Sequence, residues 1–216
     1  MTLKLNGSTA GSVSIDAPAD TSPTGTDVTL TLPTSAGSSG QYLQTDGSGG
    51  LSWQTVTDTN TNLTRGTNVA STSGIAVEFT SISSDVKRIT LALNEISTNG
   101  SSNYLIQIGD SGGFENSGYL GGVVYTGPGT SSSTSTSGWV YNLPQNSSIL
   151  SGHITVSNPT GNIWVCSGVG YRSDDGYAWT FAGSKTLSGT LDRIRLTTSN
   201  GSDTFDAGNV NIFTEV

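Results

Sequence analysis

The sequence predicts an all-β protein in which an extended N-terminal arm with short strands precedes a C-terminal β-sandwich of jelly-roll type. Ser, Thr and Gly, at 34, 32 and 29 residues, fill 95 of the 216 positions. They disfavour long helices, because Ser and Thr compete for backbone hydrogen bonds and Gly loses the most entropy on ordering. The apolar residues alternate with polar ones in short runs separated by turn residues, which is typical of strands with one buried face.

Residues 1–56 form the predicted arm, in which large apolar residues are scarce. Only 13 of the first 60 residues are of this kind, and they occur in short runs such as Val28–Leu32 and Leu51–Trp53. Because a single chain of this composition has too little to bury, we expect neighbouring copies to complete its core in a homotrimer. The residues predicted to join the copies are Leu3, Leu5, Val28, Leu30, Leu32, Leu43 and Trp53.

Residues 57–74 are polar and are predicted to form a linker. Within them, Asp58-Thr59-Asn60-Thr61-Asn62 imitates the start of a calcium-binding loop. Such a loop needs Gly at its sixth position and Glu at its twelfth, where this chain has Leu63 and Val69. We therefore predict no calcium site in this segment.

Residues 75–216 form the predicted sandwich domain, because close to one residue in three is large and apolar. Asn99-Gly100 and Asn200-Gly201 predict tight turns. The segment 127–139 begins Gly127-Pro128-Gly129, continues almost entirely as Ser and Thr, and predicts a long mobile loop. The predicted strands are 75–82, 86–96, 103–109, 119–126, 138–143, 149–157, 162–171, 177–186, 189–198 and 208–215.

Charge and cysteine content exclude several classes of protein. The chain has 8 basic and 16 acidic residues and no cluster of Lys and Arg, so we expect no nucleic-acid partner. No apolar run approaches the about 20 residues of a membrane-spanning helix, so we expect no membrane insertion. The first residues turn polar too early for a signal peptide. The single cysteine, Cys166, excludes an internal disulfide and is interpreted as a small apolar filler.

Two motifs suggest chemistry but are interpreted as structural. Gly109-Asp110-Ser111-Gly112-Gly113 matches both the nucleophile elbow and a trypsin-like serine motif. An elbow needs a helix after the serine, and a trypsin-like triad needs a histidine before it, whereas the single histidine, His153, follows it. We therefore predict a Gly-rich turn and no enzyme. His153 shares a polar strand face with Ser151 and Thr155; a metal site on a threefold axis is the alternative, and we expect no cofactor or metal.

Aromatic side chains near Gly-, Ser- and Asp-rich loops are better functional candidates. Aromatic rings beside carboxylates suit sugar rings or protein surfaces, and core packing is the alternative explanation. The recognition loops are expected around 111–120, 127–139 and 171–179. The candidate surface-recognition residues are Tyr119, Tyr125, Trp139, Tyr171, Asp174, Asp175, Tyr177 and Trp179.

Several stretches resemble bacteriophage fibre proteins. Leu30–Pro33 followed by Gly40–Trp53 resembles a segment that recurs in such fibres, and the opening Leu3–Ser8 is typical of cyanophage versions. The stretches that look like the C-terminal domain of phage tail fibres are Val86–Thr90 with Asn99–Asn103, Ile108–Gly113, and Leu191–Leu196 with Thr204–Gly208.

The resemblance implies a virion structural protein, made in the host cytoplasm: a short homotrimeric tail fibre. Its arm attaches to other virion proteins and its C-terminal domain contacts a glycan or protein of the host surface, with several weak sites adding up through multivalency. The alternative is a capsid or tail decoration or connector without receptor binding. A third hypothesis, a surface-glycan hydrolase that uses Asp174 or Asp175, requires two carboxyl groups that face each other across a substrate.

Overall fold

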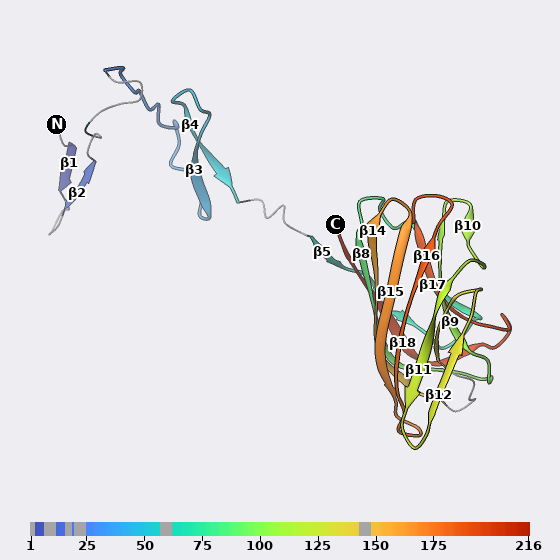
Figure 1. Ribbon diagram of the computed structural model, residues 1–216. Helices are drawn as coiled ribbons and strands as arrows, with labels where there is room; N and C mark the ends of the chain where they lie inside the picture. Colours follow the sequence, from blue (N-terminus) through green and yellow to red (C-terminus); the bar gives the residue numbers. More distant parts are fainter. Residues whose placement is uncertain (1–2, 7–11, 16–18, 20–24, 57–61, 143–147) are drawn as a thin grey trace. The chain divides into compact units, whose positions relative to one another are not determined.

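A computed structural model describes residues 3–6, 12–15, 19, 25–56, 62–142 and 148–216, and within them the chain is all-β, with antiparallel sheets and no helix (Figure 1). The predicted all-β class is thereby confirmed. The chain divides into two compact units, Met1–Asn60 and Thr61–Val216. The strands are β1 (Leu3–Asn6), β2 (Ser12–Ile15), β3 (Gln41–Thr45), β4 (Leu51–Thr55), β5 (Leu63–Arg65), β6 (Val69–Ala70), β7 (Ala76–Phe79), β8 (Arg88–Thr98), β9 (Tyr104–Asp110), β10 (Gly113–Phe114), β11 (Leu120–Thr126), β12 (Thr130–Thr134), β13 (Trp139–Asn142), β14 (Leu150–Thr160), β15 (Ile163–Arg172), β16 (Ala178–Thr186), β17 (Arg193–Thr198) and β18 (Phe205–Glu215).

The N-terminal unit contains two hairpins, β1–β2 and β3–β4. The prediction of a strand over Val28–Leu32 is wrong, because only Thr31 pairs there, in a single bridge with Gly50. The Thr31 amide donates to the Gly49 carbonyl and the Leu51 amide donates to the Thr31 carbonyl. The alternating pattern is present, but among the described residues no strand pairs with this segment beyond that single bridge.

The C-terminal unit contains two sheets. The large sheet has the order β12-β11-β16-β15-β14-β8-β18-β5, with β6 also paired to β18. The small sheet has the order β10-β9-β17-β7, with β13 paired to β9. Figure 1 shows the long strands of the large sheet side by side. All ten strands predicted between residues 75 and 216 overlap an observed strand, so the pattern of alternation located them correctly.

Two segments predicted to be irregular carry strands. Thr130–Thr134 form β12, which pairs with β11, so the prediction of a long loop over 127–139 is wrong. Residues 63–65 and 69–70 of the predicted linker pair with β18 and belong to its sheet. Both segments lie at sheet edges and are largely exposed, so they need no apolar residues, and the pattern that marks half-buried strands is missing from them. Residues 58–61 of the calcium-like motif lie outside the described residues.

The two sheets share one hydrophobic core. Along β8, Ile89, Leu91 and Leu93 are buried while the residues between them are at least partly accessible. Ile194 and Leu196 of β17 belong to the same cluster of buried side chains. Rings from both sheets meet there: those of Tyr141 in β13 and Trp179 in β16 lie 6.0 Å apart, edge to face. This favourable arrangement of aromatic rings fixes the sheets against one another.

Glycines within the strands make room for the large core rings. A Cβ atom on Gly170 would lie 2.2 Å from the Trp179 ring, and one on Gly168 would lie 2.5 Å from the Phe181 ring. Gly183 is equally close to Trp139. Because each of these aromatic residues occupies the space that a neighbouring side chain would fill, part of the high glycine content is a packing requirement of the core.

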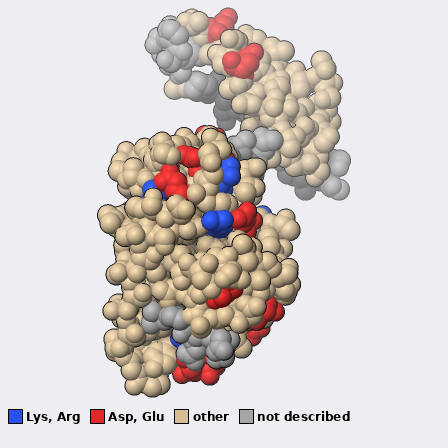
Figure 2. Space-filling model, turned by 90° about the vertical axis from the view of Figure 1, so that its right-hand side faces the viewer, with Lys and Arg blue, Asp and Glu red and all other residues tan. Residues whose placement is uncertain are grey.

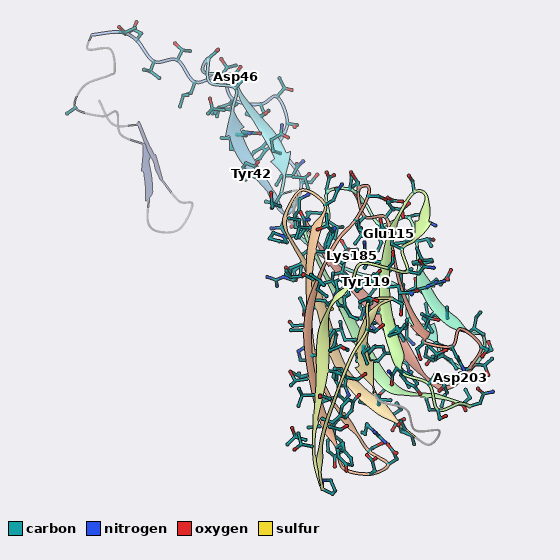
Figure 3. The ribbon with its side chains drawn as sticks, turned by 45° about the vertical axis from the view of Figure 1, so that its right-hand side comes forward. Tyr42, Asp46, Glu115, Tyr119, Lys185 and Asp203 are labelled. Carbon is teal, nitrogen blue, oxygen red and sulfur yellow. The ribbon has the colours of Figure 1, made fainter. Side chains whose placement is uncertain are left out.

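One end of the core is closed by a buried cation. Lys185 is 7% exposed, and its ammonium group forms an ion pair with the Glu115 carboxylate. The ammonium nitrogen also lies 5.5 Å from the centre of the Tyr119 ring, as Figure 3 illustrates. The Ser188 hydroxyl donates to Glu115 over 2.9 Å. These contacts give the charge of Lys185 the partners that a buried charge requires.

Stability is expected to fall in acid partly because of Glu115. Burial by itself raises the pKa of this carboxyl, but Lys185 and the hydrogen bonds from Ser188 outweigh burial and hold the pKa below its ordinary value. A carboxyl with a lowered pKa in the folded state stabilises the fold above its unfolded pKa, and that contribution is lost as pH falls through the folded pKa. Glu115→Gln is therefore expected to lower stability at pH 7 and to flatten its decline below about pH 4.5, as measured by urea unfolding between pH 7 and pH 3. An unchanged slope would contradict this assignment.

Candidate recognition surface

Four of the eight predicted surface-recognition residues lie in the core. Tyr119, Tyr125, Trp139 and Trp179 are each no more than 2% exposed, so the prediction that they contact a ligand is wrong. The physical reason is visible at Tyr119 and Trp139, whose rings stack edge to face 5.1 Å apart. These aromatic residues precede or follow loops in the sequence, but their side chains are buried in the core, so closeness to a loop does not indicate exposure.

The two acidic candidates are held by a buried arginine. Arg172 is 4% exposed, and its guanidinium lies 2.5 Å from the Asp175 carboxylate and 3.6 Å from that of Asp174. Asp174 also accepts a hydrogen bond from the Ile149 amide at 3.0 Å. Asp174 therefore fastens the β15–β16 turn to the chain around residue 149, and Asp175 ties the turn to Arg172 at the end of β15. Both carboxylates face the Arg172 guanidinium rather than presenting a pair of free acidic groups to a ligand.

The tyrosines of this turn differ in exposure. Tyr177 is partly buried and packs against the core, where its ring lies 5.6 Å from the Arg172 guanidinium. It also covers Gly127, at which a Cβ atom would lie 2.8 Å from the ring. Tyr171 is 52% exposed. Of the eight candidates, Tyr171 is therefore the one large aromatic ring freely presented to a partner.

The predicted arm residues are exposed where the structure describes their side chains. Val28, Leu30 and Leu32 are 61–70% exposed and Leu43 is 40% exposed. Trp53 differs, because it is partly buried within its own unit and its indole nitrogen donates to the Ser35 carbonyl at 2.7 Å. Leu3 and Leu5 lie in β1, but their side chains are outside the described part of the chain.

The outer face of the large sheet is a surface that the sequence analysis did not identify. On β15 the outward residues Ile163, Val165, Val169 and Tyr171 are 39–52% exposed, and Trp164 and Cys166 between them are buried. The outward positions of β11, β14, β15 and β16 carry no Asp, Glu, Lys or Arg. Apolar–polar alternation indicates which side of a strand is buried, but it gives no information on the exposed side. The sequence signal for this surface is that β15 carries apolar residues on both of its sides.

Charged residues are thinly spread over the rest of the surface. Figure 2 shows one face, on which acidic and basic side chains form small separate patches within a mostly uncharged surface. Among the described residues, no three His, Cys, Asp or Glu side chains form a group that could hold a metal ion. The same part of the chain contains no helix long and apolar enough to cross a membrane.

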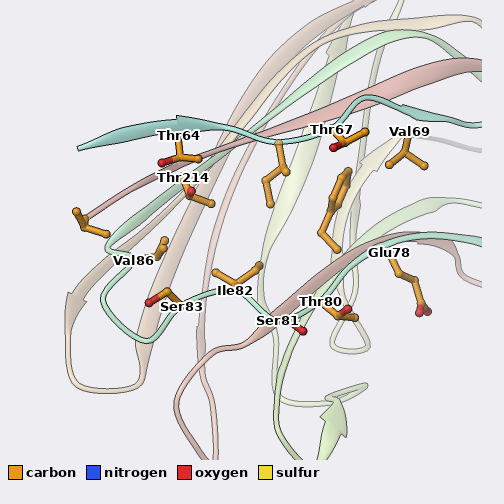
Figure 4. A pocket seen from close by; sticks show the side chains of 13 residues that line it. Thr64, Thr67, Val69, Glu78, Thr80, Ser81, Ile82, Ser83, Val86 and Thr214 are labelled. Carbon is orange, nitrogen blue, oxygen red and sulfur yellow. The ribbon is translucent and has the colours of Figure 1, made fainter. Parts of the chain in front are cut away.

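A pocket of about 510 Å³ opens beside β5, β6 and β18 (Figure 4). Val69, Phe79 and Ile82 are partly buried in it against the core, and hydroxyl groups of Thr and Ser residues line much of the remainder. Glu78 is its single charged side chain, and this carboxylate lies 3.2 Å from the guanidinium of Arg195. The lining suits a largely uncharged ligand with an apolar body, and it comes from segments too far apart in the sequence to be recognised as one site.

The Gly-rich motif, the single cysteine and the single histidine lie at a turn, in the core and on a strand, respectively. Asp110 ends β9 and Gly113 begins β10, so Gly109–Gly113 forms a hairpin turn in which the Gly112 amide donates to the Asp110 carboxylate at 2.8 Å. The predicted Gly-rich turn is confirmed. Cys166 is buried, and burial raises the pKa of its thiol well above the ordinary value, which confirms its interpretation as an apolar filler. His153 is exposed on β14 between Ser151 and Thr155.

Comparisons of the chain with protein-family models, with curated proteins and with solved structures found no match.

Proposed function

We propose that this chain is a structural protein of a bacteriophage virion: a short homotrimeric fibre attached to the particle by its N-terminal unit. The observation that carries the proposal is the exposure of Val28, Leu30 and Leu32, at 61–70%. Burying such side chains contributes about 25 cal/mol per Å² of apolar surface, and the described residues of their own chain leave them exposed. An unpartnered apolar segment of this kind supports assembly with other copies and with virion proteins.

The connections of the C-terminal strands support a jelly roll within this proposal. Eight strands taken in chain order switch between the sheets at every step except one. In the large sheet lie β6, β8, β14 and β18, and in the small sheet lie β7, β9, β13 and β17, with β9 and β13 as the one pair that stays in the same sheet. The first and last of them, β6 and β18, are neighbours. This order supports an eight-stranded jelly roll, a fold common in viral capsid and lectin domains, in which β10–β12 and β15–β16 would be insertions.

The trimer is tested by light scattering on the full chain. The expected mass is about three times 22.1 kDa. Leu30→Asp with Leu32→Asp is expected to reduce it towards that of one chain, because carboxylates replace the apolar side chains that a neighbouring copy would cover. The matched control is Thr26→Asp with Thr29→Asp, which adds the same charge in the same exposed segment. A monomeric wild type, or equal loss in both variants, argues against the trimer.

Attachment to the particle is tested separately by electron microscopy of virions that carry a gold-labelled tag after Val216. Gold on tail fibres supports the fibre, and gold on the head or tail body supports a decoration or connector without receptor binding. A specific observation favours this second candidate: four of the eight predicted recognition residues are buried and both acidic ones are paired with Arg172. Binding of the purified chain to host cells separates the two functions.

A further inference from the structure

We propose that the outer face of the large sheet, formed by the outward side chains of β11, β14, β15 and β16, binds the same face of a second copy of this chain. This interface goes beyond the proposed function, because it lies within the C-terminal unit and requires neither the arm nor a virion. Three properties of the face carry the inference: its exposure, its lack of charge and its size.

Exposure follows the pleat of the sheet. The register places Val124, Thr180, Val169 and His153 side by side across β11, β16, β15 and β14. One step along the strands, Gly122, Ala182, Ser167 and Thr155 form the next row. Small and β-branched side chains on a regular ladder give a surface of low relief, against which another backbone can approach closely.

The lack of charge distinguishes a second copy from other occupants. The chain has a net charge of −8, so copies that meet through acidic surface repel one another. A basic partner gains most by docking on that acidic surface, and little on a face without carboxylates. The outer face contains no Asp, Glu, Lys or Arg, and depletion of charged residues is the compositional mark of an interface core. Two copies of this face can therefore meet without repulsion between like charges.

The size of the face meets the requirement of a stable interface. β14, β15 and β16 each have at least nine residues and β11 has seven; at about 3.4 Å per residue and about 4.8 Å between strands, the four cover roughly 550 Å². A pair of such faces buries about 1,100 Å², above the about 1,000 Å² that a specific interface needs. Tyr171, at 52% exposure, and Val169, at 47%, supply the larger side chains on it.

The first test is hydroxyl-radical labelling of the full wild-type chain over a range of concentrations, with light scattering on the same samples. As copies associate, labelling of Tyr171 and Val169 is expected to fall at least about threefold, as these side chains become buried in an interface core. Ile75, which is 49% exposed and lies outside the face, is the internal control and keeps its labelling. Association without protection of Tyr171, or a monomer at every concentration, overturns the inference.

The outcomes distinguish this inference from the proposed function. Protection of Leu30 but not Tyr171 from labelling overturns the interface of the outer face and supports the arm-mediated trimer. Protection of Tyr171 but not Leu30 supports the interface of the outer face and argues against the arm-mediated trimer. The second test is Val165→Lys with Val169→Lys in the full chain. Like charges facing each other across an interface are expected to weaken association about 100-fold, although the two added lysines reduce the magnitude of the net charge from −8 to −6 and with it the overall repulsion between copies. Ile75→Lys is the matched control, and an equal effect of that variant overturns the assignment.

Discussion

Replacing Trp179 with Ala is expected to lower the free energy of unfolding of the C-terminal unit by about 3–5 kcal/mol, the range for truncating a buried aromatic side chain. Trp179 is 2% exposed, its ring lies 5.9 Å from that of Phe181, and it fills the space above Gly170 and Gly152. Those glycines have no side chains that could collapse into the cavity. The measurement is urea denaturation followed by circular dichroism.

Tyr171→Ala is the matched control for Trp179. The two residues come from the same end of adjacent strands and both were predicted to contact a ligand, but Tyr171 is 52% exposed. Its truncation is expected to change stability by less than about 1 kcal/mol. Similar losses in the two variants contradict the assignment of Trp179 to the core and of Tyr171 to the surface.

Replacing Asp175 with Ala is expected to cost about 3 kcal/mol, at the lower end of the range for removing one partner of a buried ion pair. Of its two carboxylate partners, the guanidinium of Arg172, 4% exposed, then retains the more distant one, Asp174, at 3.6 Å. Removing a carboxylate therefore leaves a buried charge poorly compensated, which is more costly than the loss of an exposed pair. Thermal and urea unfolding of the variant measure the loss.

The double variant Arg172→Met with Asp175→Ala separates this explanation from a general need for Asp175. Since the uncompensated charge is then absent, part of the stability is expected to return. Asp85→Ala, which removes an exposed carboxylate, is expected to remain within about 0.5 kcal/mol of the wild type. A double variant no more stable than Asp175→Ala alone excludes uncompensated charge as the cause. If the hydrolase hypothesis were correct, Asp175→Ala would also abolish the release of sugar from a surface glycan.

The candidate site could be predicted only in part, for a reason that is clearest at Tyr171 and Trp179. Both lie next to the same Gly- and Asp-containing turn, and the sequence offers the same local signal for each. The pairing of β15 with β16 aligns Tyr171 with Ala178, which sends Tyr171 outward and Trp179 inward. Alternation indicates that two residues of a strand share a face, but which face is buried depends on the sheet that packs against it.

What the sequence determined by itself was local. Scarcity of helix-forming patterns, alternation and turn residues placed the ten strands of the C-terminal unit, because strand period and turn conformation depend on neighbours in the chain. The tertiary structure decided which rings fill the core, which short strands without an alternating pattern pair at sheet edges, and that Arg172 engages both acidic candidates. It also exposed the uncharged outer face of the large sheet, which arises only when β11, β16, β15 and β14 lie side by side. These features join residues far apart in the chain, and burial depends on what packs against a residue in space.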